Sequence, residues 1–202
     1  MDNRINIRPG VSVLSVLRHL KYSYWNALAE FVDNSLQSWL LERERIKQVD
    51  GKVSALEVSI VLAPQDGGVI TVRDNAGGIP RAEFGRAFKP AAIPPDRSGF
   101  SEFGMGMKSA ACWCAAEWSV RTKALGEPFE YSVKFDIDQI VAGDVEELEV
   151  VSSKAKAGDH YTEIRLQSLH KIPTGKTLAK IKQHLADIYR NFTRRGELVL
   201  MF

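Results

Sequence analysis

The order of apolar and polar residues predicts one long amphipathic helix near the start of the chain. Apolar or aromatic side chains recur there every three or four positions, which is the spacing of a helix with one buried face. These residues are Trp25, Leu28, Val32, Leu36, Trp39 and Leu40. Ser23 is suited to cap the beginning of this helix, which is expected to continue to about Arg45. A second, polar face carries Glu30, Asp33, Asn34 and Gln37.

Alternating apolar and polar positions predict that most of the remaining chain forms a sheet. A hairpin is expected from residues 55–62 and 69–73, and further strands at 118–122, 129–135, 148–151 and 161–166. Shorter helical patterns occupy residues 11–20, 81–88, 110–116 and 176–193. Helices that precede and interrupt hairpin-linked strands predict an α+β fold, a two-layer sandwich with helices on one face of a mixed, largely antiparallel sheet.

Two segments stand apart from this pattern. The stretch from Lys89 to Gly99 is too rich in proline for a helix or a central strand, and we expect a mobile loop. Residues 197–202 are apolar and strand-like but have no predicted neighbour, and such an exposed strand is prone to aggregation. We therefore expect one domain over residues 1–170, and over residues 171–202 a C-terminal helix with the beginning of a further domain.

Composition excludes several classes of protein. With 202 residues, 45% of them hydrophobic, the chain is long enough for one domain with a full core. A net charge of +2 is too small to indicate a nucleic-acid-binding protein by overall charge. Without a basic-then-apolar leader or a membrane-spanning apolar run, a cytoplasmic protein with no membrane partner is expected. Cys112 and Cys114 do not face each other on a helix, so buried reduced thiols are expected.

The polar face of the long helix is the first candidate for chemistry. Residues four apart are neighbours on a helix, so the Glu30 carboxylate and the Asn34 amide converge. A magnesium ion takes oxygen ligands and is commonly held by one or two protein groups together with substrate phosphates and water. Asn34 could supply an oxygen, and Glu30 could take a proton from a water. An ordinary solvated acidic edge is the alternative interpretation of this helix taken alone.

A second motif follows the predicted strand at 69–73. Asp74 is followed by Asn75, Ala76, Gly77, Gly78, Ile79 and Pro80. As structure alone, this is a tight turn. As a site, the missing side chains at Gly77 and Gly78 would let a flat ring approach the backbone. Asp74 would then accept a hydrogen bond from an exocyclic amine, which adenine has and guanine lacks at that position, a preference of ~1–3 kcal/mol.

A third motif runs from Gly104 to Ser109 and opens the predicted helix at 110–116. Its sequence is Gly104-Met105-Gly106-Met107-Lys108-Ser109. The free backbone N–H groups and the dipole at a helix N-terminus can bind a phosphate. A flexible joint is the alternative, and the motif differs from a Walker sequence in its spacing and in lacking a preceding strand.

Together with Thr162 in a late predicted strand, these motifs occur in an order that resembles the gyrase, heat-shock chaperone, histidine kinase and MutL superfamily, called GHKL, with its Bergerat-type fold. The resemblance covers roughly residues 22–166, and the sequences of the motifs are similar to those of the MORC-like and chaperone-like branches. It implies ATP and Mg²⁺ as ligands, Glu30 as the general base, Asn34 as the magnesium ligand, and Asp74 as an adenine contact.

The same resemblance implies a set of nucleotide-binding residues along the chain. They are Asp33, Asn34, Asp74, Gly78, Ile79, Gly104, Met105, Gly106, Met107, Lys108, Ser109 and Thr162. The proline-rich loop would be the lid over ATP. Residues 171–202 would include the start of a transducer-like domain, which in the superfamily typically supplies a further phosphate-contacting lysine.

Three positions depart from the superfamily pattern. Ala76 stands where the first glycine of an Asp-x-Gly-x-Gly motif is usual, and Ser101 replaces the leading glycine of the phosphate loop. Both changes are small and are expected to be tolerated where the backbone keeps a negative φ. Gln37 replaces a frequent aspartate, which we expect to affect the rate of hydrolysis rather than binding.

The predicted function is an ATP-binding, Mg-dependent ATPase module of a larger protein, whose nucleotide state controls dimerisation or a conformational clamp. The resemblance implies a nucleotide-dependent homodimer of the full-length protein and slow hydrolysis by these 202 residues alone. The alternatives are a non-hydrolysing nucleotide-binding switch or scaffold and a histidine-kinase-type catalytic domain. Glu30 and the sequence around Lys108 favour the hydrolase branches. The sequence leaves open whether the client is DNA or protein.

Overall fold

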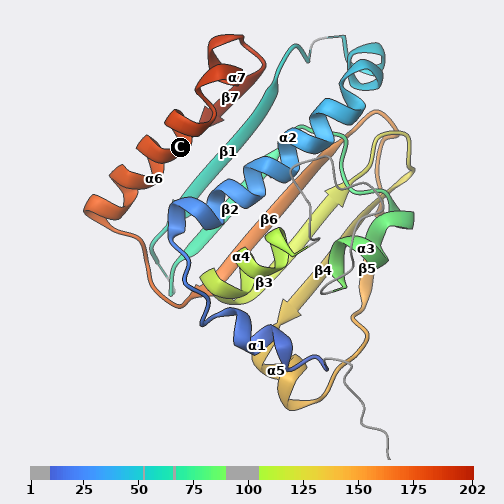
Figure 1. Cartoon of the computed structure of the whole chain (residues 1–202). Coiled ribbons are helices and arrows are strands. Elements are labelled where there is room, and N and C mark those ends of the chain that lie inside the picture. Colours follow the sequence, from blue (N-terminus) through green and yellow to red (C-terminus); the bar gives the residue numbers. More distant parts are fainter. Residues whose placement is uncertain (1–9, 52, 66, 90–104) are drawn as a thin grey trace, which may run out of the picture.

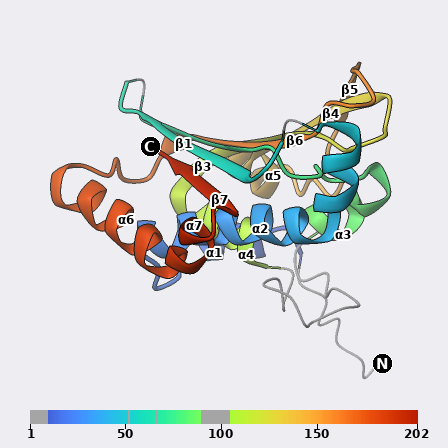
Figure 2. The same ribbon diagram turned by 90° about the horizontal axis from the view of Figure 1, so that it is seen from above.

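The computed structural model describes residues 10–51, 53–65, 67–89 and 105–202 (Figure 1). Seen from above, the sheet forms one layer, and helices α2, α4 and α6 lie together on one face of it (Figure 2). The predicted α+β two-layer sandwich is confirmed. The sheet is mixed, because one of its pairs of neighbouring strands is parallel and the others are antiparallel.

The elements follow one another as predicted, with a few additions. The helices are α1 (Val13–Leu17), α2 (Tyr24–Val49), α3 (Phe84–Phe88), α4 (Gly106–Cys114), α5 (Ile137–Ala142), α6 (Gly175–Ile188) and α7 (Arg190–Arg194), with a 3-10 turn η1 (Arg81–Glu83) before α3. The strands are β1 (Leu56–Ala63), β2 (Val69–Asp74), β3 (Ala115–Lys123), β4 (Phe129–Asp136), β5 (Val150–Lys154), β6 (Tyr161–Leu169) and β7 (Leu198–Met201). Their order in the sheet is β5-β4-β3-β6-β2-β1-β7.

The long helix α2 is the predicted one, and its beginning is capped as expected. The Ser23 hydroxyl accepts a hydrogen bond from the backbone N–H of Asn26 at 3.4 Å, which satisfies one of the free donors of the first turn. The helix continues to Val49, beyond the predicted end at Arg45. The predicted hairpin is the antiparallel pair β1–β2.

The C-terminal run forms a strand with a neighbour, so the expectation that it stands alone is wrong. Leu198–Met201 pairs in parallel with β1, with Leu198 opposite Leu56. Figure 1 shows α6 and α7 leading the chain back to this edge of the sheet. Both Leu198 and Leu56 are buried, so β7 adds to the core of the described chain. The division of the chain at residue 170 stays a prediction.

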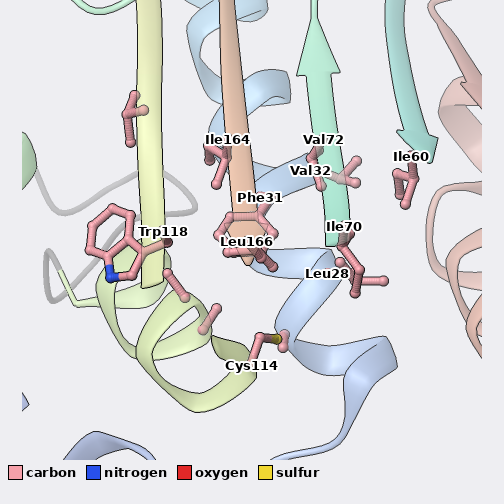
Figure 3. Packing of buried hydrophobic residues seen from close by; sticks show 14 of the residues in the cluster. Leu28, Phe31, Val32, Ile60, Ile70, Val72, Cys114, Trp118, Ile164 and Leu166 are labelled. Carbon is pink, nitrogen blue, oxygen red and sulfur yellow. The ribbon is translucent and has the colours of Figure 1, made fainter. Parts of the chain in front are cut away.

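The core lies between α2, α4 and the inner face of the sheet. Leu28, Phe31 and Val32 of α2 point towards the strands (Figure 3). On β3, Trp118 stacks on Phe135 of β4 with ring centroids 3.7 Å apart. Fully burying such a side chain stabilises the fold by about 1.5–3 kcal/mol. The packing of Leu28, Phe31 and Val32 against the strands fixes the rotation of α2 about its axis and therefore the direction of its polar face.

Three further predictions concern single segments. The expected mobile loop lies outside the described residues except for Lys89, and so does Ser101. Cys112 and Cys114 are buried and free, as predicted, and burial raises the pKa of the Cys112 thiol to about 12. None of the helices in the described part of the chain is both long and apolar enough to cross a membrane.

Candidate functional site

The polar face of α2 carries three half-buried side chains that bond to their surroundings. The Asn34 amide nitrogen donates to the backbone carbonyl of Glu30 at 2.7 Å, so the amide oxygen is the atom that suits a metal ion. The Tyr22 hydroxyl donates to Oε1 of Glu30 at 2.9 Å. The Tyr189 hydroxyl, from the junction of α6 and α7, lies 2.6 Å from Oδ1 of Asp33.

Burial makes both acids of this face weaker acids than usual. Desolvation raises the pKa of Glu30; the hydrogen bond from Tyr22 opposes this, and the charge of Asp33 adds to it. Desolvation likewise raises the pKa of Asp33, and the hydrogen bond from Tyr189 opposes it. A carboxylate with a raised pKa is a stronger base once it is ionised, which suits Glu30 to accept a proton.

Asp74 ends β2 and is held by three hydrogen-bond donors. Its Oδ1 accepts the backbone N–H groups of Ala76 and Thr162, each at 3.0 Å, and its Oδ2 accepts the Ser35 hydroxyl at 2.6 Å. The side chain is buried, and desolvation raises its pKa while these bonds oppose the shift. A carboxylate has about four lone-pair sites, so it can accept a further donor. Asp74 therefore has capacity for one hydrogen bond beyond the three that it already accepts.

A threonine on β3 links two of the predicted nucleotide contacts. The Thr122 hydroxyl oxygen accepts the backbone N–H of Ile79 at 2.8 Å and lies 3.2 Å from the Thr162 hydroxyl. The Thr122 hydroxyl also lies 3.1 Å from the carbonyl oxygen of Tyr161. The turn after Asp74 is thereby fixed to the central strands β3 and β6.

The two glycines of the turn are required by packing inside the protein. Gly78 has φ +74°, and a Cβ there would lie 2.1 Å from the Lys123 carbonyl oxygen. At Gly77, a Cβ would lie 2.8 Å from Cγ of Glu42 on α2. The space along these two Cβ directions is thus filled by protein. The approach of a flat ring to this turn and the adenine contact of Gly78 stay predictions. Ala76 keeps a negative φ, as its tolerance requires.

The third motif brings the beginning of α4 against the Glu30 carboxylate. Gly104 lies outside the described residues, Met105 is the N-cap, and Gly106 is the first residue of α4. A Cβ at Gly106 would lie only 2.1 Å from Oε2 of Glu30. The missing side chain therefore allows the acid to lie against the helix start. Met107 is half-buried and packs against the core.

Lys108 and Ser109 are buried, and Lys108 faces another helix. Its ammonium donates to the backbone carbonyls of Arg86 at 3.3 Å and Ala87 at 2.9 Å, in α3. Burial, together with the Arg86 charge, lowers the pKa of Lys108 to about 8. A phosphate contact by Lys108 stays a prediction and requires the side chain to leave these carbonyls.

The hydroxyl groups around the site were not predicted from the sequence. They belong to Tyr22, Ser35, Thr122 and Tyr189. Three of them contact an acid, and Ser35 and Tyr189 do so across elements that are distant in sequence. Hydroxyl residues are too common for a pattern to single these out, although Tyr22 lies eight residues before Glu30 and Ser35 two residues after Asp33.

Direct contacts join the predicted motifs. Ser35 of α2 bonds to Asp74 at the end of β2, Thr162 of β6 bonds to the same Asp74, and Glu30 of α2 lies against Gly106 of α4. No three His, Cys, Asp or Glu side chains in the described ranges are grouped to hold a metal ion by themselves. A magnesium ion held by phosphates, water and one protein oxygen does not need such a group.

The comparisons with known proteins agree with this arrangement. Residues 22–167 match the family described as histidine kinase-, DNA gyrase B-, and HSP90-like ATPase. The match spans most of the chain and all of the motifs described above. No curated protein matches the chain at a significant level. The chain therefore belongs to the histidine kinase-, DNA gyrase B- and HSP90-like ATPase family.

Proposed function

We propose that the chain is an ATP-binding, magnesium-dependent ATPase module in which Glu30 is the general base. The observation that carries this proposal is the position of the Glu30 carboxylate. One of its oxygens is bound by the Tyr22 hydroxyl, and the other lies against Gly106 at the start of α4. Membership of an ATPase family supports nucleotide binding, and the base beside a helix N-terminus favours hydrolysis over a passive switch.

Each predicted contact has a chemical role in this proposal. The remaining acceptor capacity of Asp74 suits the exocyclic amine of adenine, with Thr162 and Ile79 beside it. The amide oxygen of Asn34 would hold the magnesium ion, and the start of α4 would face the phosphates. When bound, the ion neutralises phosphate charge that develops during the reaction.

The reaction that we propose is the attack of a water on the terminal phosphate. Oε2 of Glu30 takes a proton from the water while the water oxygen forms a bond to the terminal phosphorus. The bond from that phosphorus to the bridging oxygen breaks, and its electron pair stays on ADP. The products are ADP, inorganic phosphate and a protonated Glu30, which then returns its proton to solvent.

The test replaces Glu30 by Gln, which keeps an oxygen for the Tyr22 hydroxyl but cannot take the proton. We expect ATP binding to persist and turnover to fall by about two to four orders of magnitude. Glu44→Gln is the matched control, because this acid on the same helix is exposed and pairs with Arg43. Hydrolysis by Glu30→Gln at the parental rate would refute the proposal.

The proposed selectivity for adenine has its own test. Titration calorimetry with ATP and with GTP, each with and without Mg²⁺, should show tighter binding of ATP by about tenfold or more and a requirement for the ion. Equal affinities for the two nucleotides would show that Asp74 does not read the base.

We further propose that nucleotide binding closes a homodimer of the full-length protein. This rests on the resemblance of the motifs to dimeric members of the superfamily. Sedimentation with a non-hydrolysable ATP analogue should show dimers of the full-length protein and largely monomers of these 202 residues. Turnover per site that is equal in both proteins and independent of concentration would contradict the clamp.

A further inference from the structure

The Glu30 carboxylate is oriented by contacts to both of its oxygens. Oε1 accepts the Tyr22 hydroxyl at 2.9 Å, and Oε2 lies where a side chain at Gly106 would otherwise be. The terminal torsion of a glutamate side chain is broad and nearly two-fold. Because Gly106 supplies open space rather than a side-chain partner, Tyr22 provides the described side-chain hydrogen bond that fixes this torsion.

Tyr22 is itself held by the other end of α4. The Trp113 indole, in the last turn of that helix, donates to the backbone carbonyl of Leu20 at 3.1 Å. The backbone N–H of Tyr22 donates to the same carbonyl at 2.9 Å, and the rings of Tyr22 and Trp113 have centroids 6.0 Å apart. Helix α4 therefore meets Glu30 twice, directly at its first residue and through Tyr22 at its last turn.

We propose that Tyr22 is a positioning residue for Glu30, holding the carboxylate so that Oε2 faces the start of α4. This inference rests on the proposed role of Glu30 as general base. It assigns to Tyr22 the choice of which oxygen receives the proton. Without the hydroxyl, the carboxylate can turn about its last torsion, and the base is correctly aimed for a smaller fraction of the time.

The same hydrogen bond influences the ionisation of Glu30. The groups that face this acid are Tyr22, Asp33 on α2, Tyr189 beside α7, and the first residue of α4. Burial and the Asp33 charge raise the pKa of Glu30, whereas the Tyr22 hydrogen bond lowers it. Burial also raises the pKa of Tyr22, so its hydroxyl remains a donor at every working pH.

The experiment compares Tyr22→Phe with Tyr24→Phe in the whole protein. Each variant loses one hydroxyl and keeps a ring against Trp113, but the Tyr24 hydroxyl donates to the backbone carbonyl of Lys171 and not to Glu30. The readouts are kcat and KM for ATP at neutral pH, with thermal unfolding to confirm that both variants fold.

For Tyr22→Phe we expect kcat at neutral pH to fall about ten- to a hundredfold, with KM nearly unchanged. Tyr24→Phe should keep the parental kcat and KM. In a Glu30→Gln background, Tyr22→Phe should cause no further loss of kcat.

Three outcomes would overturn the inference. They are a parental kcat in Tyr22→Phe, the same fall in kcat in Tyr24→Phe, and a further loss of kcat in the Glu30→Gln background. The failure of the proposed function is distinguishable, because it would appear as parental turnover in Glu30→Gln alone. If Glu30→Gln is inactive and Tyr22→Phe keeps the parental kcat, only the positioning role is refuted.

Discussion

Replacing Asp74 by Ala and by Asn should separate its structural role from its role in binding. In Asp74→Ala, the buried backbone N–H groups of Ala76 and Thr162 both lose their acceptor. Each unsatisfied buried donor costs about 1–3 kcal/mol, so the free energy of unfolding should fall by about 2–6 kcal/mol. The free energy of unfolding of a typical domain is about 5–15 kcal/mol, so this loss is a large part of it.

Asp74→Asn should leave the fold nearly intact. Its single oxygen can keep both backbone N–H groups, and its amide nitrogen would face the Ser35 hydroxyl. That hydroxyl can turn its one hydrogen to the carbonyl of Phe31, 3.0 Å away, and accept from the amide. We expect a loss of stability of about 1 kcal/mol or less. An amide nitrogen cannot accept the adenine amine, so the affinity for ATP should fall by about ten- to a hundredfold.

The assays are denaturant unfolding monitored by circular dichroism and titration calorimetry with ATP. Asp187→Asn, at an exposed acid of α6, is the control. The reasoning about buried donors is refuted if Asp74→Ala is as stable as the parent protein. The reasoning about the base is refuted if Asp74→Asn is well folded and binds ATP with parental affinity.

Three other predictions concern turnover and the free energy of unfolding, the latter measured by denaturant unfolding. Gly106→Ala should fold but lose turnover by about a hundredfold, because its Cβ would displace the proposed base. Gly78→Ala should instead lose about 3 kcal/mol or more of stability, because its Cβ would meet the backbone of β3. Similar effects of the two substitutions would contradict this contrast. Tyr189→Phe removes a 2.6 Å hydrogen bond to Asp33 and should lower the free energy of unfolding by about 2 kcal/mol, and no loss in denaturant unfolding would count against it. The pKa of Lys108 is lowered from 10.5 to about 8, so the unfolded chain binds more protons between these values; the parent's stability should rise with pH there, and Lys108→Met should abolish that rise.

The parts of the fold that are governed by local pattern could be predicted from the sequence. The period of α2 and the alternation of β1 and β2 each depend on neighbouring residues, and both were confirmed. Helix α5 was missed although Asp136 caps it by accepting the N–H of Gln139, a local signal in a short helix. The pairing of β7 could not be predicted, because its partner β1 lies far away in the sequence.

Within the site, the acids could be predicted and their partners could not. Glu30 and Asp74 were singled out by the residues around them, Asn34 four positions on and the glycines of the turn, and their roles stay predictions. Ser35 and Tyr189 are unremarkable in the sequence, and only the packing of α2 against β2 and α7 gives them a role. The direction of Lys108 was also unpredictable, since the carbonyls of α3 that it contacts are brought near by the fold.

The buried acids show how the site and the stability of the fold are coupled. Burial raises the pKa of Glu30, Asp33 and Asp74, so the folded chain binds protons more tightly at these groups than the unfolded chain does. Their contribution to stability is therefore full below the unfolded pKa and is lost as the pH rises through the folded pKa. At the pH where the proposed base is ionised, the fold thus holds desolvated charges. The hydroxyls of Tyr22, Tyr189 and Ser35, one on each acid, offset part of that cost while fixing the direction of each carboxylate. The same hydrogen bonds that make the ionised site tolerable therefore also determine where its oxygens point.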